Sequence, residues 1–77
     1  MKKASRKAKR FVVCLSNAGY AASLDVRKIY VSLPDEIAEK RGMLRVIDES
    51  GEDYLFPSSR FAAIDLPKDV ERAIGAG

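Results

Sequence analysis

Five short apolar runs, separated by turn-forming residues, constrain the fold of this 77-residue chain more than any other feature. The runs cover residues 11–15, 27–33, 43–48, 53–56 and 61–64. Each is rich in β-branched or aromatic residues and has the length of a single strand. In the second run the aliphatic residues Ile29, Val31 and Leu33 alternate with polar ones, which predicts that these three face the core. Tyr30 is then expected on the opposite, exposed face.

The connections between these runs differ in length and chemistry. Residues 16–26 predict a long first loop that opens with turn-forming residues. Residues 34–42 predict one or two helical turns, because Pro34 suits the first helical position and Gly42 the stop. Gly51 suits the positive φ of a tight hairpin, and residues 58–60 predict a 3₁₀ turn. A short C-terminal helix is expected to start at Pro67.

Closure is the best solution for five strands of this size, because a closed sheet hides its edges. The sequence therefore predicts an all-β fold, a small five-stranded barrel with a short helical connector and a short C-terminal helix. Tyr54 and Phe56 share one strand parity, so both are expected to point inward, where Phe61 joins them. Cys14 lies within an apolar strand and is expected to pack in the core.

The net charge of +3 hides an uneven distribution of charge. Six of the 14 basic residues precede Phe11 with no acid among them, which leaves 8 basic residues against 11 acidic ones in the remainder. The six are Lys2, Lys3, Arg6, Lys7, Lys9 and Arg10. Dense like charge without apolar periodicity predicts a disordered basic tail over residues 1–9. The predicted barrel spans residues 10–66, and residues 67–77 form the helix and C-terminal end.

Composition argues against several classes of function. The chain has no histidine, which removes the usual general base and the commonest metal ligand. A single cysteine excludes an intrachain disulfide. No apolar run approaches the length of a membrane span, and the first run is too short for a signal peptide. We expect a cytoplasmic, non-enzymatic protein with no cofactor, no metal, no small-molecule substrate and no membrane partner.

The segment Gly51-Glu52-Asp53-Tyr54-Leu55-Phe56-Pro57-Ser58-Ser59-Arg60-Phe61 resembles the closing segment of Src-homology-3 (SH3) domains. The longer string from residue 44 to residue 57 also resembles a group of small bacterial proteins of this barrel type. The resemblance covers residues 11 to about 66. It implies an SH3-like fold, in which residues 17–26 match the long first loop.

Only some residues of the SH3 family's peptide-binding groove have counterparts in this sequence. Pro57 matches the proline of the closing turn, whereas Arg60 stands where the family has a tyrosine. The chain has no tryptophan, and Tyr20 is only a loose counterpart of the aromatic residues in the family's first loop. Recognition of proline-rich peptides needs an aromatic-lined groove. The resemblance therefore implies the fold more than this function.

Two functional hypotheses follow from these features. The first is a protein-binding or adaptor module that meets an unknown protein partner through Tyr20, Tyr30, Leu55, Pro57 and Arg60. The alternative is a nucleic-acid-binding or ribosome-associated accessory protein that uses the basic tail, because lysine and arginine neutralise phosphates. The four carboxylates at positions 48, 49, 52 and 53 match no calcium-loop spacing, so the sequence predicts a solvated hairpin there.

Overall fold

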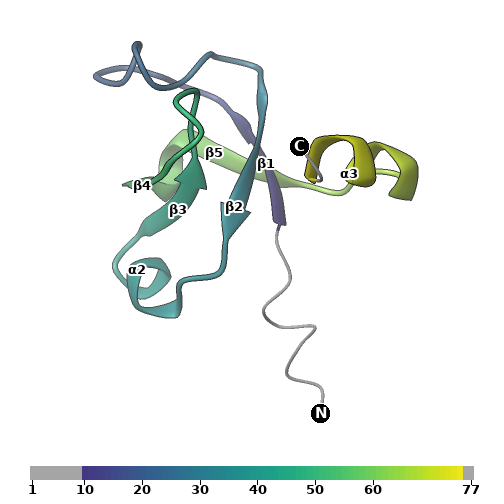
Figure 1. The fold of residues 1–77 in the computed structure, drawn as a ribbon. Helices are drawn as coiled ribbons and strands as arrows, with labels where there is room; N and C mark the ends of the chain where they lie inside the picture. The colour runs from purple at the N-terminus through teal and green to yellow at the C-terminus, as the bar shows by residue number, and fades with distance from the viewer. Residues whose placement is uncertain (1–9, 76–77) are drawn as a thin grey trace.

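A computed structural model describes residues 10–75 of the chain. In this part, five strands alternate with two short α-helices and one 3₁₀ turn (Figure 1). The strands are β1 (Arg10–Cys14), β2 (Ile29–Leu33), β3 (Met43–Ile47), β4 (Asp53–Pro57) and β5 (Phe61–Ile64). The helices are α2 (Glu36–Lys40) and α3 (Lys68–Gly75), and the 3₁₀ turn η1 (Ser58–Arg60) joins β4 to β5. Every predicted strand and helix is confirmed within a few residues, whereas the predicted tail over residues 1–9 lies outside the described residues.

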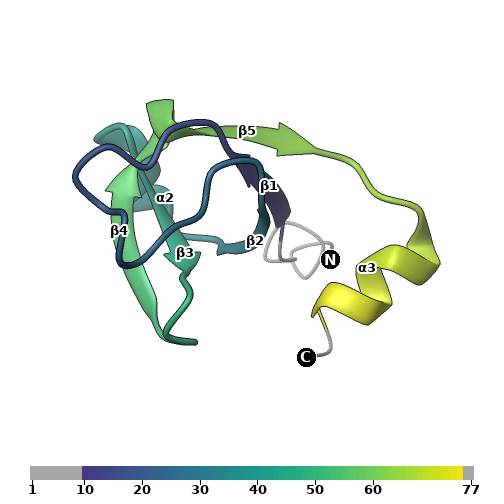
Figure 2. The ribbon, with the colours of Figure 1, turned by 90° about the horizontal axis from the view of Figure 1, so that it is seen from above.

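The five strands form one open antiparallel sheet in the order β4-β3-β2-β1-β5. Figure 2 shows that the sheet curls strongly, with the long first loop lying on the side of β4. Among the described residues β4 and β5 have one strand neighbour each and are the edges of the sheet. The mostly β class is therefore confirmed, and closure into a barrel stays a prediction.

Local chemistry explains where the short connections begin and end. Helix α2 starts after Asp35, whose carboxylate accepts a hydrogen bond from the N–H of Ala38 at 3.0 Å. Asp35, rather than Pro34, is therefore the residue that sets the start of this helix. Gly51 has a φ of 87°, which a tight hairpin requires and other residues adopt only under strain.

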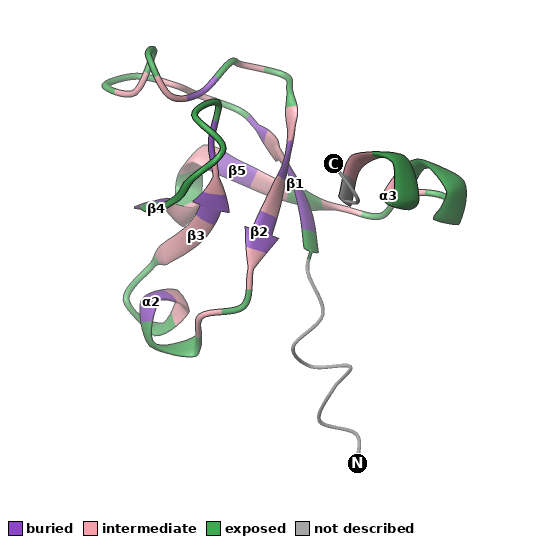
Figure 3. Ribbon diagram, in the orientation of Figure 1, coloured by how far each residue is buried: buried purple, intermediate pink, exposed green. Residues whose placement is uncertain are grey.

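Seven buried residues pack together as the hydrophobic core. They are Val12, Cys14, Leu24, Tyr30, Val46, Phe56 and Phe61. Figure 3 colours the buried parts of the ribbon purple. The predicted burial of Cys14, Phe56 and Phe61 is confirmed. Leu24 is fully buried although it belongs to the long loop rather than to a strand. The Asn17 side chain holds this part of the loop through a 2.9 Å bond from Nδ2 to the carbonyl of Leu24.

Two predicted side-chain orientations are wrong. Tyr30, expected to be exposed, is only 5% exposed, and its face of β2 is the buried one. Ile29, Val31 and Leu33 are only half-buried on the other face. The reason is that Tyr30 lies opposite buried Val12 on β1, and its hydroxyl accepts a hydrogen bond from the N–H of Asp25.

Tyr54, expected to point into the core, is 50% exposed. It shares strand parity with buried Phe56 but lies two residues nearer the hairpin, on an edge strand. Phe56 on the same strand is only 3% exposed, so the position of Tyr54 nearer the hairpin, and not the strand edge alone, places its ring at the rim of the core.

Candidate functional site

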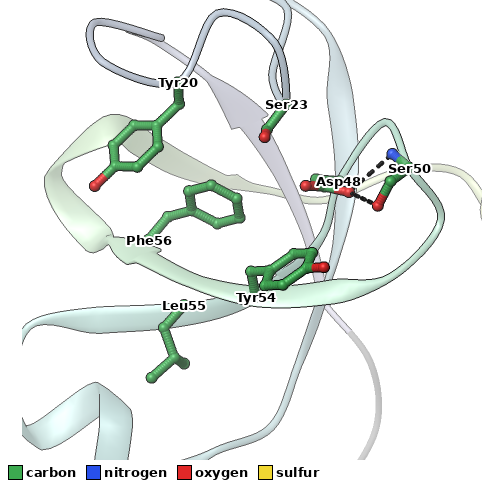
Figure 4. A pocket seen from close by; sticks show the side chains of 7 residues that line it. All are labelled: Tyr20, Ser23, Asp48, Ser50, Tyr54, Leu55 and Phe56. Atoms are coloured by element: carbon green, nitrogen blue, oxygen red, sulfur yellow. Dashed lines mark hydrogen bonds between the residues drawn. The ribbon is translucent and has the colours of Figure 1, made fainter.

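A shallow cleft of about 400 Å³ lies between the long first loop and the β3–β4 hairpin. Figure 4 shows side chains of both segments facing each other across it. The lining residues are Tyr20 and Ser23 from the loop and Asp48, Ser50, Tyr54, Leu55 and Phe56 from the hairpin and β4. The fold thus brings together residues about thirty positions apart in the sequence.

Aromatic rings form the floor and one wall of the cleft. The ring centroids of Tyr20 and Phe56 lie 5.1 Å apart at an interplanar angle of 83°, an edge-to-face contact. Phe56 makes a second edge-to-face contact with Phe61, 6.2 Å away in the core. The floor is therefore anchored in the hydrophobic core, while the half-exposed ring of Tyr54 leaves apolar surface open at the rim.

A polar network joins the long first loop to the β3–β4 hairpin, the two segments between which the cleft lies. The Tyr30 hydroxyl donates to Glu49 Oε2 at 2.5 Å and accepts from the N–H of Asp25 at 2.7 Å. The N–H of Glu49 donates to the carbonyl of Ser23 at 3.0 Å, and Lys28 pairs with the same carboxylate at 2.6 Å. Glu49 thereby joins the loop to the hairpin through its backbone and its side chain. We call these contacts the Glu49 latch.

The latch perturbs the ionisation of its members in consistent directions. The pKa of Glu49 is lowered, chiefly by the hydrogen bond from Lys28 and then by that from Tyr30. The pKa of Lys28 is raised by the same carboxylate. Burial, followed by the hydrogen bond to Glu49, raises the pKa of Tyr30 well above its usual value. The network therefore holds a carboxylate, an ammonium and a neutral phenol at neutral pH.

Asp48 closes the hairpin end of the cleft and is only 7% exposed. Its Oδ1 accepts two hydrogen bonds from Ser50, one from the backbone N–H at 2.8 Å and one from the hydroxyl at 2.5 Å. The prediction of a wholly solvated acidic hairpin is wrong at this residue. The turn after Asp48 bends back toward this residue, because the Asp48 carboxylate accepts the hydrogen bonds that Ser50 donates.

The residues predicted from sequence as a binding surface are not all brought together. Tyr20 lies in the cleft, and Leu55 contributes to its lining, but Figure 4 shows the Leu55 side chain pointing away from the rings. Pro57 is half-buried at the end of β4. Arg60 is not one of the lining residues; its guanidinium lies 5.8 Å from the Tyr20 ring and donates a 2.9 Å hydrogen bond to Ser16 Oγ. Tyr30 is buried beneath the cleft and presents no ring surface to a partner.

Five lining residues were not assigned to a binding surface from the sequence: Ser23, Asp48, Ser50, Tyr54 and Phe56. The only available signal was the density of carboxylates in the hairpin, which does not indicate which of them is buried. Of the predicted basic residues, Arg10 is exposed at the start of β1, and the other five precede the described part of the chain.

Other chemistry in the described residues is limited. Cys14 is fully buried, and burial raises the pKa of its thiol, which disfavours the reactive thiolate. Residues 10–75 contain no group of three or more histidine, cysteine, aspartate or glutamate side chains placed to hold a metal ion. No helix in the same part of the chain is long and apolar enough to cross a membrane.

Comparison with known proteins found no matching protein family, no matching curated protein and no matching solved structure.

Proposed function

We propose that this chain is a non-enzymatic protein-binding module and that the cleft receives a peptide segment of its partner. The observation that carries this proposal is the half-exposed Tyr54 ring at the mouth of a cleft whose floor is aromatic. Tyrosine is enriched among residues that dominate binding energy, because it offers a large rigid surface with a polar tip. A partner covering this surface removes apolar area from water.

The arrangement of the connections supports an SH3-like fold for this module. The chain has a long first loop, a helical connector, a tight hairpin and a 3₁₀ turn, in that order. The resemblance of residues 51–61 to the SH3 closing segment agrees with this order. We therefore propose an SH3-like barrel whose partner surface is the side of the β3–β4 hairpin. This fold is a rigid scaffold, which suits recognition by a pre-formed site.

Selection from a random peptide library displayed on phage tests the proposed function. We expect enriched peptides that perturb the amide NMR signals of the cleft residues and leave those of α3 unchanged. Peptides that bind only elsewhere, or a failure to enrich any sequence over an unrelated domain of similar size, would contradict the proposal.

A further inference from the structure

Asp48 presents one oxygen that the fold leaves available. Both hydrogen bonds from Ser50 go to Oδ1, and among the described residues Oδ2 has no hydrogen bond. No fully buried polar side-chain atom in the described residues lacks a partner, so Oδ2 keeps some exposed surface, and Asp48 is one of the residues that line the cleft. Figure 4 shows this second oxygen on the side of Ser23 and the Phe56 ring. A carboxylate that is more than nine-tenths buried thus aims a free acceptor into the cleft.

The charge of Asp48 also lacks a counterion within the described residues, because no lysine or arginine nitrogen lies within 4.0 Å of it. Three basic residues in the described part of the chain bind other groups. Lys28 pairs with Glu49, Arg45 pairs with carboxylates on β4 and just before α2, and Arg60 bonds to Ser16. A buried carboxylate is costly unless it is paired. Asp48 therefore has reason to take a cation from outside the fold.

The rest of the cleft suits both the methylene groups and the cationic group of a basic side chain. Tyr20, Tyr54 and Phe56 supply aromatic surface, on which the methylene groups of lysine or arginine pack and their charge is attracted to the ring faces. Within the fold, the Arg60 guanidinium lies 5.8 Å from the centre of the Tyr20 ring. Exposed Glu52 adds negative charge at the rim.

We infer that the hairpin end of the cleft is a subsite for the cationic side chain, arginine or lysine, of a protein partner. The cationic group of that side chain pairs with Asp48 Oδ2, and its methylene groups pack against the aromatic floor. This inference rests on the proposed function and names the chemistry of the ligand. It concerns the carboxylate at the end of the cleft, whereas the proposed function depends only on the aromatic surface.

A titration followed by amide NMR tests the subsite with small probes, so the partner itself is not needed. The probes are N-acetyl-arginine amide and N-acetyl-citrulline amide, which have nearly the same shape but differ in charge. We expect the arginine probe to shift the signals of cleft residues saturably and to bind at least about tenfold more tightly than the citrulline probe. This comparison uses the wild-type chain, so it does not depend on how a variant folds.

Two variants test which carboxylate of the chain recognises the positive charge of the arginine probe. Asp48→Asn keeps an oxygen for the Ser50 hydrogen bonds and removes the charge, so it should abolish the preference for arginine. Glu52→Gln removes the same charge from the exposed rim and still accepts the Tyr54 hydroxyl, so it should change the affinity by no more than about twofold. Equal losses in both variants would indicate a general field of the hairpin and would overturn the inference.

Equal affinity for the two probes, or no shift in the cleft, would also overturn the inference. Either result would leave the peptide-binding proposal to be decided by the library selection. A chain lacking residues 2–9 should bind the arginine probe with unchanged affinity. Tighter binding after this deletion would show that the chain's own basic residues compete for the subsite, which would contradict its assignment to a partner.

Discussion

Tyr30 illustrates how one side chain links the core to the candidate site. Its ring packs in the core and its hydroxyl emerges between the long loop and the hairpin, where it has both a donor and an acceptor partner. A buried hydroxyl without such partners is costly. Its burial therefore depends on Glu49 and on the backbone of Asp25, two groups that the alternation of β2 does not reveal. This is why sequence reasoning placed Tyr30 on the wrong face.

Leu24 is a second residue whose role only the fold reveals. It lies in a loop without clear periodicity, yet it is one of the most completely buried side chains among the described residues. The loop folds back over the end of the core, and Leu24 fills the space beside the aromatic cluster. A pattern-based prediction assigns core positions within strands and helices, so it passes over an isolated leucine in a loop.

Leu24→Ala is expected to reduce the free energy of unfolding by about 2–4 kcal/mol, because it removes a fully buried side chain and leaves a cavity. Urea unfolding followed by circular dichroism measures this loss. The matched control is Leu15→Ala, whose side chain is 55% exposed and which should change stability by less than about 1 kcal/mol. Similar losses in the two variants would contradict the assigned place of Leu24 in the core.

Among the elements, those bounded by strong turn chemistry were predictable. Gly42 and Gly51 both have positive φ, and the segments between them match the predicted strand and hairpin within a residue or two. The faces of the strands were less predictable. In β2 the alternation of aliphatic and polar residues indicates the wrong face, because the buried set consists of Tyr30 and Ser32. On the edge strand β4, parity alone does not tell whether a residue is covered.

The relation between the long loop and the β3–β4 hairpin could not be predicted, because it depends on contacts distant in sequence. The Glu49 latch joins residues 19 to 26 positions apart, through a phenol, an ammonium and a backbone carbonyl. None of these groups forms a recognisable motif. The cleft lies between the two segments that this latch joins, so the candidate site depends on tertiary structure.

The latch predicts a specific dependence of stability on pH. The folded chain lowers the pKa of Glu49, so the unfolded chain takes up a proton at a higher pH than the folded chain does. The stabilisation from this group is fully present above the ordinary glutamate pKa of about 4.3 and is lost as the pH falls through the lower folded value. Glu49→Gln should therefore be less stable than the wild type at pH 7, with the difference shrinking below about pH 4.

Urea midpoints measured between neutral and acidic pH check this prediction. Glu71→Gln, in α3 and away from the latch, is the control and should follow the wild-type curve. A constant difference between Glu49→Gln and wild type across the acidic range would mean that the latch does not act through the charge of Glu49.

At the scale of the whole molecule, charge separates into a basic N-terminal segment and a mildly acidic remainder. This separation is fully visible in the sequence. It underlies the alternative hypothesis of nucleic-acid binding, which the cleft does not favour because carboxylates line and border it. The two hypotheses assign function to different parts of the chain. A variant that lacks one part therefore tests one hypothesis and leaves the other part intact.

Deleting residues 2–9 tests the alternative hypothesis. If the basic segment binds nucleic acid, the full chain should bind generic RNA at low salt, with an affinity that falls steeply as salt increases. The deletion, which removes five of the six positive charges, should abolish most of this binding. Fluorescence polarisation with a labelled RNA measures both effects. Absence of binding at low salt, or binding unaffected by the deletion, would exclude this role for the segment.

In the proposed function, the aromatic cleft is the surface through which this chain binds its partner. Tyr54 and Leu55 provide the most direct test, because these neighbours on β4 are both substantially exposed and their side chains point in opposite directions (Figure 4). The measurement is the affinity of a library-selected peptide for Tyr54→Ala and for Leu55→Ala. Tyr54→Ala should weaken binding by about tenfold or more, and Leu55→Ala by no more than about twofold. Equal effects, or a greater loss in Leu55→Ala, would contradict the claim.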